Sequence, residues 1–134
     1  MTDFKKYTVL IVDDDDAMRN TILFDFKRKG FAVLDADSAA KAFDLVKVNR
    51  VDLVISDMRM PGGDGMSLVE AIRKYDPRIP VVIFVTGFSD YTEEECVAKG
   101  AMKVVPKPFD RAVLMNSALS ALEVIDKMRL TTAP

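Results

Sequence analysis

Residues 8–30, with the sequence TVLIVDDDDAMRNTILFDFKRKG, contain the pattern that decides the fold. Thr8–Val12 is an apolar run, which predicts a β-strand that the rest of the protein covers on both faces. The acidic residues after it lead into a helical pattern, and Asp16 is the residue expected to cap that helix. Gly30 stands where a residue with left-handed backbone angles would end it. Apolar side chains recur at every fourth position of the helix, at Met18, Ile22 and Phe26.

The same order, a strand and then a helix, repeats along the rest of the chain. The further predicted strands are Ala32–Leu34, Leu53–Ile55, Val81–Val85 and Lys103–Val105. Helices are predicted after Ser38, which can act as a cap, over Ser67–Tyr75, over Thr92–Ala98 and after the cap Asp110. Five strand–helix units joined by right-handed crossovers form a doubly wound parallel sheet with helices on both faces, so the predicted fold class is α/β, (βα)₅. Pro106 lacks an N–H group, which suits an edge strand.

The size and composition of the chain indicate one globular domain. Hydrophobic residues make up 49% and charged residues 30% of the 134 residues, a balance typical of a soluble globular protein. We expect residues 1–130 to form the domain and residues 131–134 (TTAP) to be a frayed C-terminal tail. The net charge of −2 does not indicate a nucleic-acid partner. Neither a signal peptide nor a membrane span is recognised, so the cytoplasm is the expected location.

Two residue counts exclude several kinds of site. The chain contains no histidine, which excludes Ser–His and Cys–His nucleophiles and histidine-bound zinc. The single cysteine, Cys96, cannot form an internal disulfide and is expected to be a small buried hydrophobic residue.

Polar residues gather where the predicted strands end. They are Asp13 and Asp14, Asp57, Thr86 and Lys107. Each has an ordinary interpretation by itself, as a helix N-terminus, a turn residue or a solvated lysine. Together they would meet at one edge of the sheet, where converging carboxylates need a cation. Oxygen ligands without histidine or cysteine suit Mg²⁺, and a carboxylate can form an aspartyl phosphate.

Four segments resemble the signatures of the receiver domain of bacterial two-component response regulators. They are TVLIVDDDDAMR (8–19), VDLVISDMRMPGGDG (51–65), VVIFVTG (81–87) and VVPKPF (104–109), in the family's order. The resemblance covers about residues 8–130 and implies the flavodoxin-like strand order 2-1-3-4-5. It also implies a cis peptide bond between Lys107 and Pro108.

The resemblance assigns a role to each polar residue at the strand ends. Asp57 would be the phosphoacceptor, and Asp13 and Asp14 would join it in holding Mg²⁺, a site that Mn²⁺ would also fit. The backbone carbonyl of Arg59 would supply a further metal ligand. Thr86 would bind the phosphoryl group and couple it to the conformational switch, and Lys107 would pair with that group.

The sequence departs from the family at Val104, where many members carry a tyrosine or phenylalanine that swings inward. A valine has no ring to swing, and the substitutes considered for this role are Phe84, Phe88 and Phe109. Arg59 and Phe88 occupy positions that flank the path of the hydrolytic water in this family. A bulky apolar ring there predicts slow autodephosphorylation.

The function implied by the resemblance is a phosphorylation-dependent signalling switch. The phosphoryl group would come from a sensor histidine kinase or a phosphotransfer protein, and partner binding would change at the face of the fourth helix, fifth strand and fifth helix. Such a domain contacts neither nucleic acid nor membrane, and it catalyses only its own phosphotransfer and autodephosphorylation.

Two other functions remain open from the residues. A degenerate receiver would bind partners without phosphorylation. A haloacid-dehalogenase-type phosphatase would use Asp13 as its nucleophile, since Asp13-Asp14-Asp15 satisfies that family's first motif. Against the phosphatase, only Asp110 follows Lys107 closely as an acidic residue, and no cap insertion is recognised.

Overall fold

The computed structural model describes residues 3–87 and 91–132 and contains one parallel sheet of five strands. The strand order is β2-β1-β3-β4-β5, as predicted, and all four neighbouring pairs are parallel. The strands are β1 (Thr8–Val12), β2 (Ala32–Ala36), β3 (Leu53–Ser56), β4 (Val81–Thr86) and β5 (Lys103–Pro106). Four of them run one or two residues further than predicted, up to the polar residues at the strand ends.

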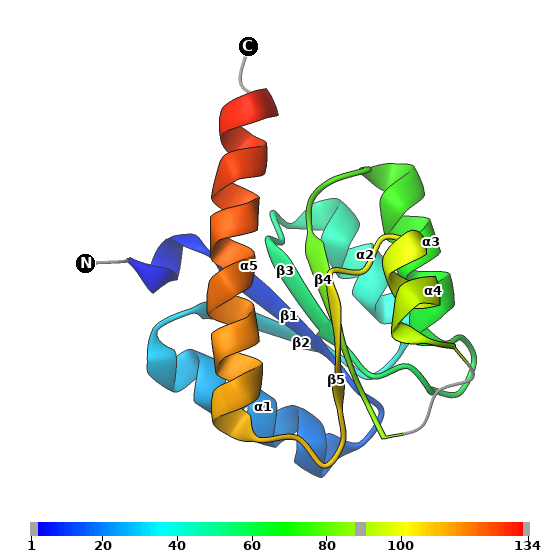
Figure 1. The fold of residues 1–134 in the computed structure, drawn as a ribbon. Coiled ribbons are helices and arrows are strands. Elements are labelled where there is room, and N and C mark those ends of the chain that lie inside the picture. Colours follow the sequence, from blue (N-terminus) through cyan, green and yellow to red (C-terminus); the bar gives the residue numbers. More distant parts are fainter. Residues whose placement is uncertain (1–2, 88–90, 133–134) are drawn as a thin grey trace.

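Helices cover both faces of this sheet (Figure 1). After the short 3₁₀ helix η1 (Phe4–Lys6), the helices are α1 (Asp16–Lys29), α2 (Ala39–Val48), α3 (Gly65–Tyr75), α4 (Glu93–Ala98) and α5 (Arg111–Thr132). Helices α1 and α5 pack on one face, and α2, α3 and α4 pack on the other. The doubly wound α/β architecture is therefore confirmed.

The alternation of side chains along the strands divides the core into two clusters. Odd-numbered residues such as Val9, Ile55 and Ile83 face α1 and α5. Even-numbered residues such as Leu10 and Phe84 face the other three helices. Both sets are buried, which explains why the central strands are apolar throughout rather than alternating with polar residues.

Most helix ends lie where the sequence predicts them. Gly30 ends α1 in the left-handed conformation, with a φ of 115°. The Ser38 side chain accepts a hydrogen bond from the Lys41 N–H, and the Asp110 carboxylate accepts one from the Ala112 N–H at 2.7 Å. Thr92 begins α4 with a capping box, in which its hydroxyl and the Glu95 carboxylate bind each other's backbone N–H.

Two predicted helix starts are wrong. Asp15, not Asp16, caps α1, because its carboxylate accepts the Met18 N–H at 3.1 Å while Asp16 lies in the first turn. Four consecutive aspartates offer equivalent caps, and only the path of the chain out of β1 selects one of them. Helix α3 begins two residues before Ser67, at Gly65, with Asp64 as its cap. A side chain at Gly65 would clash, because its Cβ would lie 2.6 Å from the Phe84 ring.

The last helix extends into the C-terminal segment 131–134. Helix α5 continues through Thr132, so the first two residues of the stretch expected to fray are helical. Its buried stripe is as predicted, consisting of Leu114, Ala118, Leu122 and Ile125. Within the described residues, the structure has no helix that combines the length and apolar character needed to cross a membrane.

Candidate functional site

The carboxyl ends of the parallel strands bring three predicted carboxylates together. Asp13 and Asp14 follow β1, and Asp57 follows β3, the neighbouring strand in the sheet. One ligand oxygen from each of the three lies within 4.8 Å of the others. The prediction that these side chains converge is confirmed.

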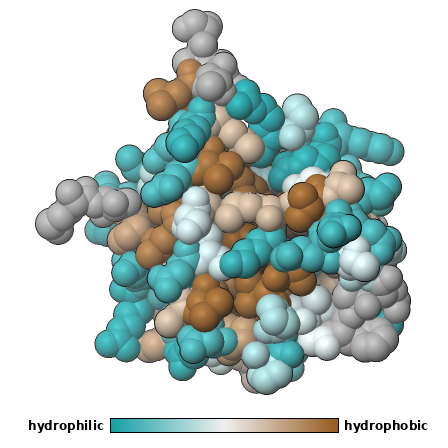
Figure 2. Space-filling view, in the orientation of Figure 1, coloured by the Kyte–Doolittle hydropathy of each residue, from teal (hydrophilic) through white to brown (hydrophobic). Residues whose placement is uncertain are grey.

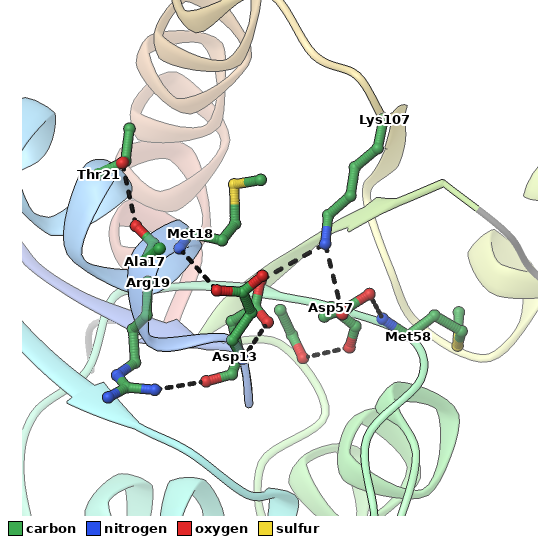
Figure 3. Close-up of polar contacts among 10 residues, drawn as sticks. Asp13, Ala17, Met18, Arg19, Thr21, Asp57, Met58 and Lys107 are labelled. Carbon is green, nitrogen blue, oxygen red and sulfur yellow. Dashed lines mark hydrogen bonds and ion pairs between the residues drawn. The ribbon is translucent and has the colours of Figure 1, made fainter.

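Lys107 lies beside this cluster (Figure 3). Its Nζ is 3.4 Å from Asp57 Oδ2 and 3.5 Å from Asp13 Oδ2, so one ammonium group faces two carboxylates. The lysine follows β5, and its backbone N–H donates to the Thr86 carbonyl at 2.9 Å, which continues the pairing of β5 with β4. The expected cis bond between Lys107 and Pro108 is present, and a second cis bond joins Ile79 and Pro80.

Asp57 presents one carboxylate oxygen to the lysine and has the other held by the backbone. Its Oδ1 accepts the Met58 N–H at 2.7 Å. Its carbonyl oxygen accepts the Ser56 hydroxyl at 2.8 Å, so the chain around the aspartate is also held. The side chain is 13% exposed, which leaves it within reach of a small reactant while most of its surface is covered. Such a carboxylate is positioned to act as a nucleophile through Oδ2.

Asp13 is the most deeply buried member of the cluster, with a side chain only 3% exposed. Its carboxylate accepts the Asp15 N–H at 2.9 Å. Burial raises the pKa of Asp13, and the negative charge of Asp57 raises it further, although the Asp15 N–H and Lys107 oppose this change. The ionised form is therefore costly in this environment, and a bound cation would favour it.

The ligands in this cluster suit a hard divalent cation. Asp14 is exposed, so the cluster opens to solvent on the side where an ion could enter. Three carboxylates against the one ammonium of Lys107 leave an excess of negative charge, and all the side-chain donors are oxygens. Oxygen ligands from one or two carboxylates, completed by water, are typical of Mg²⁺ in proteins.

The other predicted site residues lie near the same edge of the sheet. Thr86 is the last residue of β4, is 7% exposed and is aligned with Pro106 of β5. Arg59 lies two residues beyond Asp57 in the loop after β3, with an exposed side chain. The roles predicted for the Thr86 hydroxyl and the Arg59 carbonyl remain predictions. Phe88 lies outside the described residues.

The structure limits the search for a ring that replaces the missing aromatic at Val104. Phe84 is fully buried beneath Gly65, which does not fit a ring that swings. Phe109 packs in the cluster on the α1–α5 side, whereas Val104 packs in the other cluster. Tyr91, just before α4, packs in the same cluster as Val104 and was not among the predicted substitutes.

Sequence reasoning also missed a contact at Val104 itself. The Val104 N–H donates to Glu93 Oε2 at 3.0 Å, so the carboxylate in the first turn of α4 binds the backbone of β5. Glu93 is one of three consecutive glutamates, and the sequence distinguishes only Glu95, through its capping-box spacing from Thr92. Only the position of α4 beside β5 shows which one faces the strand.

A second buried acidic site lies at the amino ends of the strands, and the sequence did not predict it either. Asp52, just before β3, accepts the Thr8 N–H at 2.7 Å and pairs with the guanidinium of Arg129 from α5. Nearby, the Tyr7 hydroxyl donates to the Asp126 carboxylate at 2.8 Å. These contacts link β1 and β3 to the C-terminal half of α5.

Comparisons with known proteins identify relatives of the whole domain. The family model for the response regulator receiver domain matches residues 9–119. The transcriptional regulatory protein GlrR of Escherichia coli (strain K12) is 33% identical over 115 residues, which are 86% of this chain and 26% of that protein. The C4-dicarboxylate transport transcriptional regulatory protein DctD of Rhizobium meliloti (strain 1021) is 34% identical over 117 residues, 87% of this chain and 25% of that protein.

Solved structures agree with these sequence relatives. The chemotaxis response regulator CheY4 of Vibrio cholerae superposes with a TM-score of 0.78 at 26% identity, covering 86% of this chain and 98% of that one. A receiver domain protein from Clostridium thermocellum gives a TM-score of 0.81 at 27% identity, covering 94% and 99%. The chain spans about a quarter of the length of the two curated relatives named above.

Proposed function

Since the chain belongs to the response regulator receiver domain family, and so is a phosphorylation-dependent signalling switch, we propose that Asp57 accepts its phosphoryl group. The observation that carries this proposal is the cluster of Asp13, Asp14 and Asp57 within 4.8 Å, with the Lys107 ammonium beside it. The Asp57 side chain is 13% exposed, so it combines a partly open carboxylate with an ammonium group 3.4 Å away and two neighbouring carboxylates.

In this proposal a divalent cation, Mg²⁺ or Mn²⁺, is held by the three aspartates and the Arg59 carbonyl. When bound, it would neutralise the charges of the phosphoryl group and the carboxylates around it. Asp13 is the ligand best fixed in advance, since its carboxylate is buried and bound to the Asp15 N–H. Asp14 is exposed and would complete the site from the solvent side.

The chain's own residues would position and stabilise the transfer. Asp57 Oδ2 forms the new bond to phosphorus while the bond from phosphorus to the donor's histidine nitrogen breaks, and that nitrogen keeps the electron pair. Lys107 Nζ, already 3.4 Å from Oδ2, would donate to a phosphoryl oxygen, and the Thr86 hydroxyl to another. The domain would perform only this transfer and the later hydrolysis, which we expect to be slow if Phe88 shields the acyl phosphate.

The partners follow from the same proposal. A sensor histidine kinase or a phosphotransfer protein in the cytoplasm would supply the phosphoryl group, and an output protein or domain would bind the α4–β5–α5 face. That face carries hydrophobic and hydrophilic side chains interspersed (Figure 2), including the half-exposed Val97 of α4 and Val113 of α5. A non-obligate interface is about as apolar as the rest of a protein surface, so this composition is compatible with reversible binding.

Incubation with acetyl phosphate and Mg²⁺, followed by intact-mass measurement, tests the proposal directly. Native protein is expected to gain the mass of one phosphoryl group, and Asp57→Asn is expected to gain none. Asp64→Asn, a carboxylate that caps α3, serves as the matched control and should be phosphorylated like the native protein. Absence of any adduct on folded native protein, with no response to beryllofluoride, would instead support a degenerate receiver.

A further inference from the structure

The edge of the sheet at β5 carries a contact that joins the strand to α4. β5 is an outer strand, and outer strands present backbone N–H groups that lack a strand partner. At Val104 this donor is bound by Glu93 Oε2 at 3.0 Å. The bond uses the backbone of Val104, so it needs no aromatic side chain at that position.

Helix α4 is attached unevenly at its two ends. At its C-terminal end, Cys96 is buried in the core and Ala101 is buried just beyond the helix. There the guanidinium of Arg73 from α3 also donates to the Gly100 carbonyl at 3.1 Å and to the Pro80 carbonyl at 2.7 Å. The first turn of α4, residues 93–95, is exposed, and Glu93 binds the sheet there by accepting the Val104 N–H. The N-terminal end of α4 is therefore the end that can move at least cost.

Thr86 and Glu93 lie at the two ends of the connection between β4 and α4. Thr86 is aligned with Pro106 of β5, two residues beyond Val104. A shift of Thr86 toward a group on Asp57 would pull on this connection and on the end of β5 together. Both movements would change the separation of Glu93 Oε2 from the Val104 N–H, which is 3.0 Å in this structure.

We propose that Glu93 is a positioning residue that holds α4 against β5 in the unphosphorylated protein and releases it when Asp57 is phosphorylated. This inference rests on the proposed function, and it assigns to a hydrogen bond on the strand edge the coupling that a swinging ring cannot provide here. A contact made in only one of two states biases the equilibrium toward that state. By linkage, its removal raises the affinity for any ligand that favours the other state by the same factor.

Amide hydrogen exchange at Val104, in the absence of any phosphoryl donor, tests the contact itself. Native protein is expected to protect this amide, and Glu93→Ala is expected to lower the protection about three- to tenfold, the range of a single hydrogen bond. Glu93→Gln keeps an acceptor oxygen and should retain most of the protection. Glu94→Ala removes the same charge from the neighbouring residue and should leave Val104 unchanged. Equal protection in Glu93→Ala and native protein would overturn the inference.

Binding of beryllofluoride with Mg²⁺ tests whether the contact is coupled to phosphorylation. The ligand is expected to reduce Val104 protection in native protein, and Glu93→Ala is expected to bind it about three- to tenfold more tightly than native protein or Glu94→Ala. Unchanged affinity in Glu93→Ala, with Val104 deprotected, would show a purely structural contact and overturn the inference while leaving the function of Asp57 intact. If native protein binds no beryllofluoride, the proposed function fails first and the coupling fails with it.

Discussion

The amino ends and the carboxyl ends of the parallel strands hold buried aspartates in opposite ways. At the amino ends of the strands, Asp52 is fully buried and its charge is paired with arginine. One of its oxygens accepts the Thr8 N–H, and the other pairs with the Arg129 guanidinium, with Arg50 Nε 3.8 Å away. This edge is electrically balanced and ties α5 to two strands.

At the carboxyl ends of the strands, the carboxylates outnumber the cations. Asp13 is almost as buried as Asp52, yet it shares a single ammonium, that of Lys107, with Asp57 and lies close to Asp14. Burial raises the pKa of Asp13, so folding disfavours the ionised form of this carboxyl. The comparison indicates that the same residue type can tie elements of the fold together where its charge is paired, and offers ligands to a cation where it is in excess.

The largest expected effect is the loss of phosphorylation on Asp57→Asn. Phosphoryl incorporation from acetyl phosphate should disappear, because the substitution removes the proposed nucleophile, the Asp57 carboxylate. The free energy of unfolding in the absence of metal should stay equal or rise, since one repelling charge is removed. Intact mass and urea unfolding on the same samples measure both quantities. A clearly destabilised variant would contradict the view that this edge is strained by its own charge.

Asp52→Ala is expected to lower the free energy of unfolding by about 2–4 kcal/mol while leaving phosphorylation intact. The substitution leaves the Arg129 guanidinium, which is mostly covered, without its partner carboxylate, and the Thr8 N–H without an acceptor. Urea unfolding measures the loss, and folded molecules should still be phosphorylated. Asp44→Ala removes an exposed aspartate and should change the stability by less than about 0.5 kcal/mol. A loss as small as that control in Asp52→Ala would show that water replaces the pair.

Addition of Mg²⁺ is expected to stabilise the native protein through the unbalanced edge. At a concentration ten times the dissociation constant, the gain is about 1.4 kcal/mol, which a thermal melt detects as a rise in Tm. Asp13→Asn should lose most of this gain, and Asp52→Ala should keep it despite its lower starting stability. Equal gains in native protein and Asp13→Asn would place the ion elsewhere.

The smallest expected effect is a pH dependence that belongs to Asp13. A carboxyl whose pKa is raised by folding favours the folded state when protonated, and this contribution is lost as the pH rises through the raised pKa. Without metal, Asp13→Asn should therefore exceed native protein in stability at neutral pH by an amount on the order of 1 kcal/mol. The difference should vanish below the ordinary carboxyl pKa. Urea unfolding from pH 3 to pH 8, with about 1 mM chelator in the buffer, measures it; a difference that stays constant with pH would contradict the assignment to Asp13.

The candidate site was predictable from the sequence because it lies at strand ends. Once Thr8–Val12 and Leu53–Ile55 are recognised as neighbouring parallel strands, Asp13 and Asp57 must meet at the same edge. The position of Lys107 follows in the same way from the end of β5. The cap of α1 was not predictable, because Asp15 and Asp16 are equivalent in the sequence and differ only in where the backbone turns.

The amino-acid sequence by itself determined the five strand–helix units, their parallel direction and the residues at their carboxyl ends, because each depends on local periodicity and on general rules of chain connection. The order of the strands in the sheet came from the resemblance to the receiver family. The tertiary structure decided which charges meet across long separations. Asp52 and Arg129 are 77 residues apart, and Glu93 meets Val104 only because α4 lies along the outer edge of β5. Side chains reach 3 Å contacts through the packing of whole elements, and no local pattern of residues records which of several equivalent acids that packing will select.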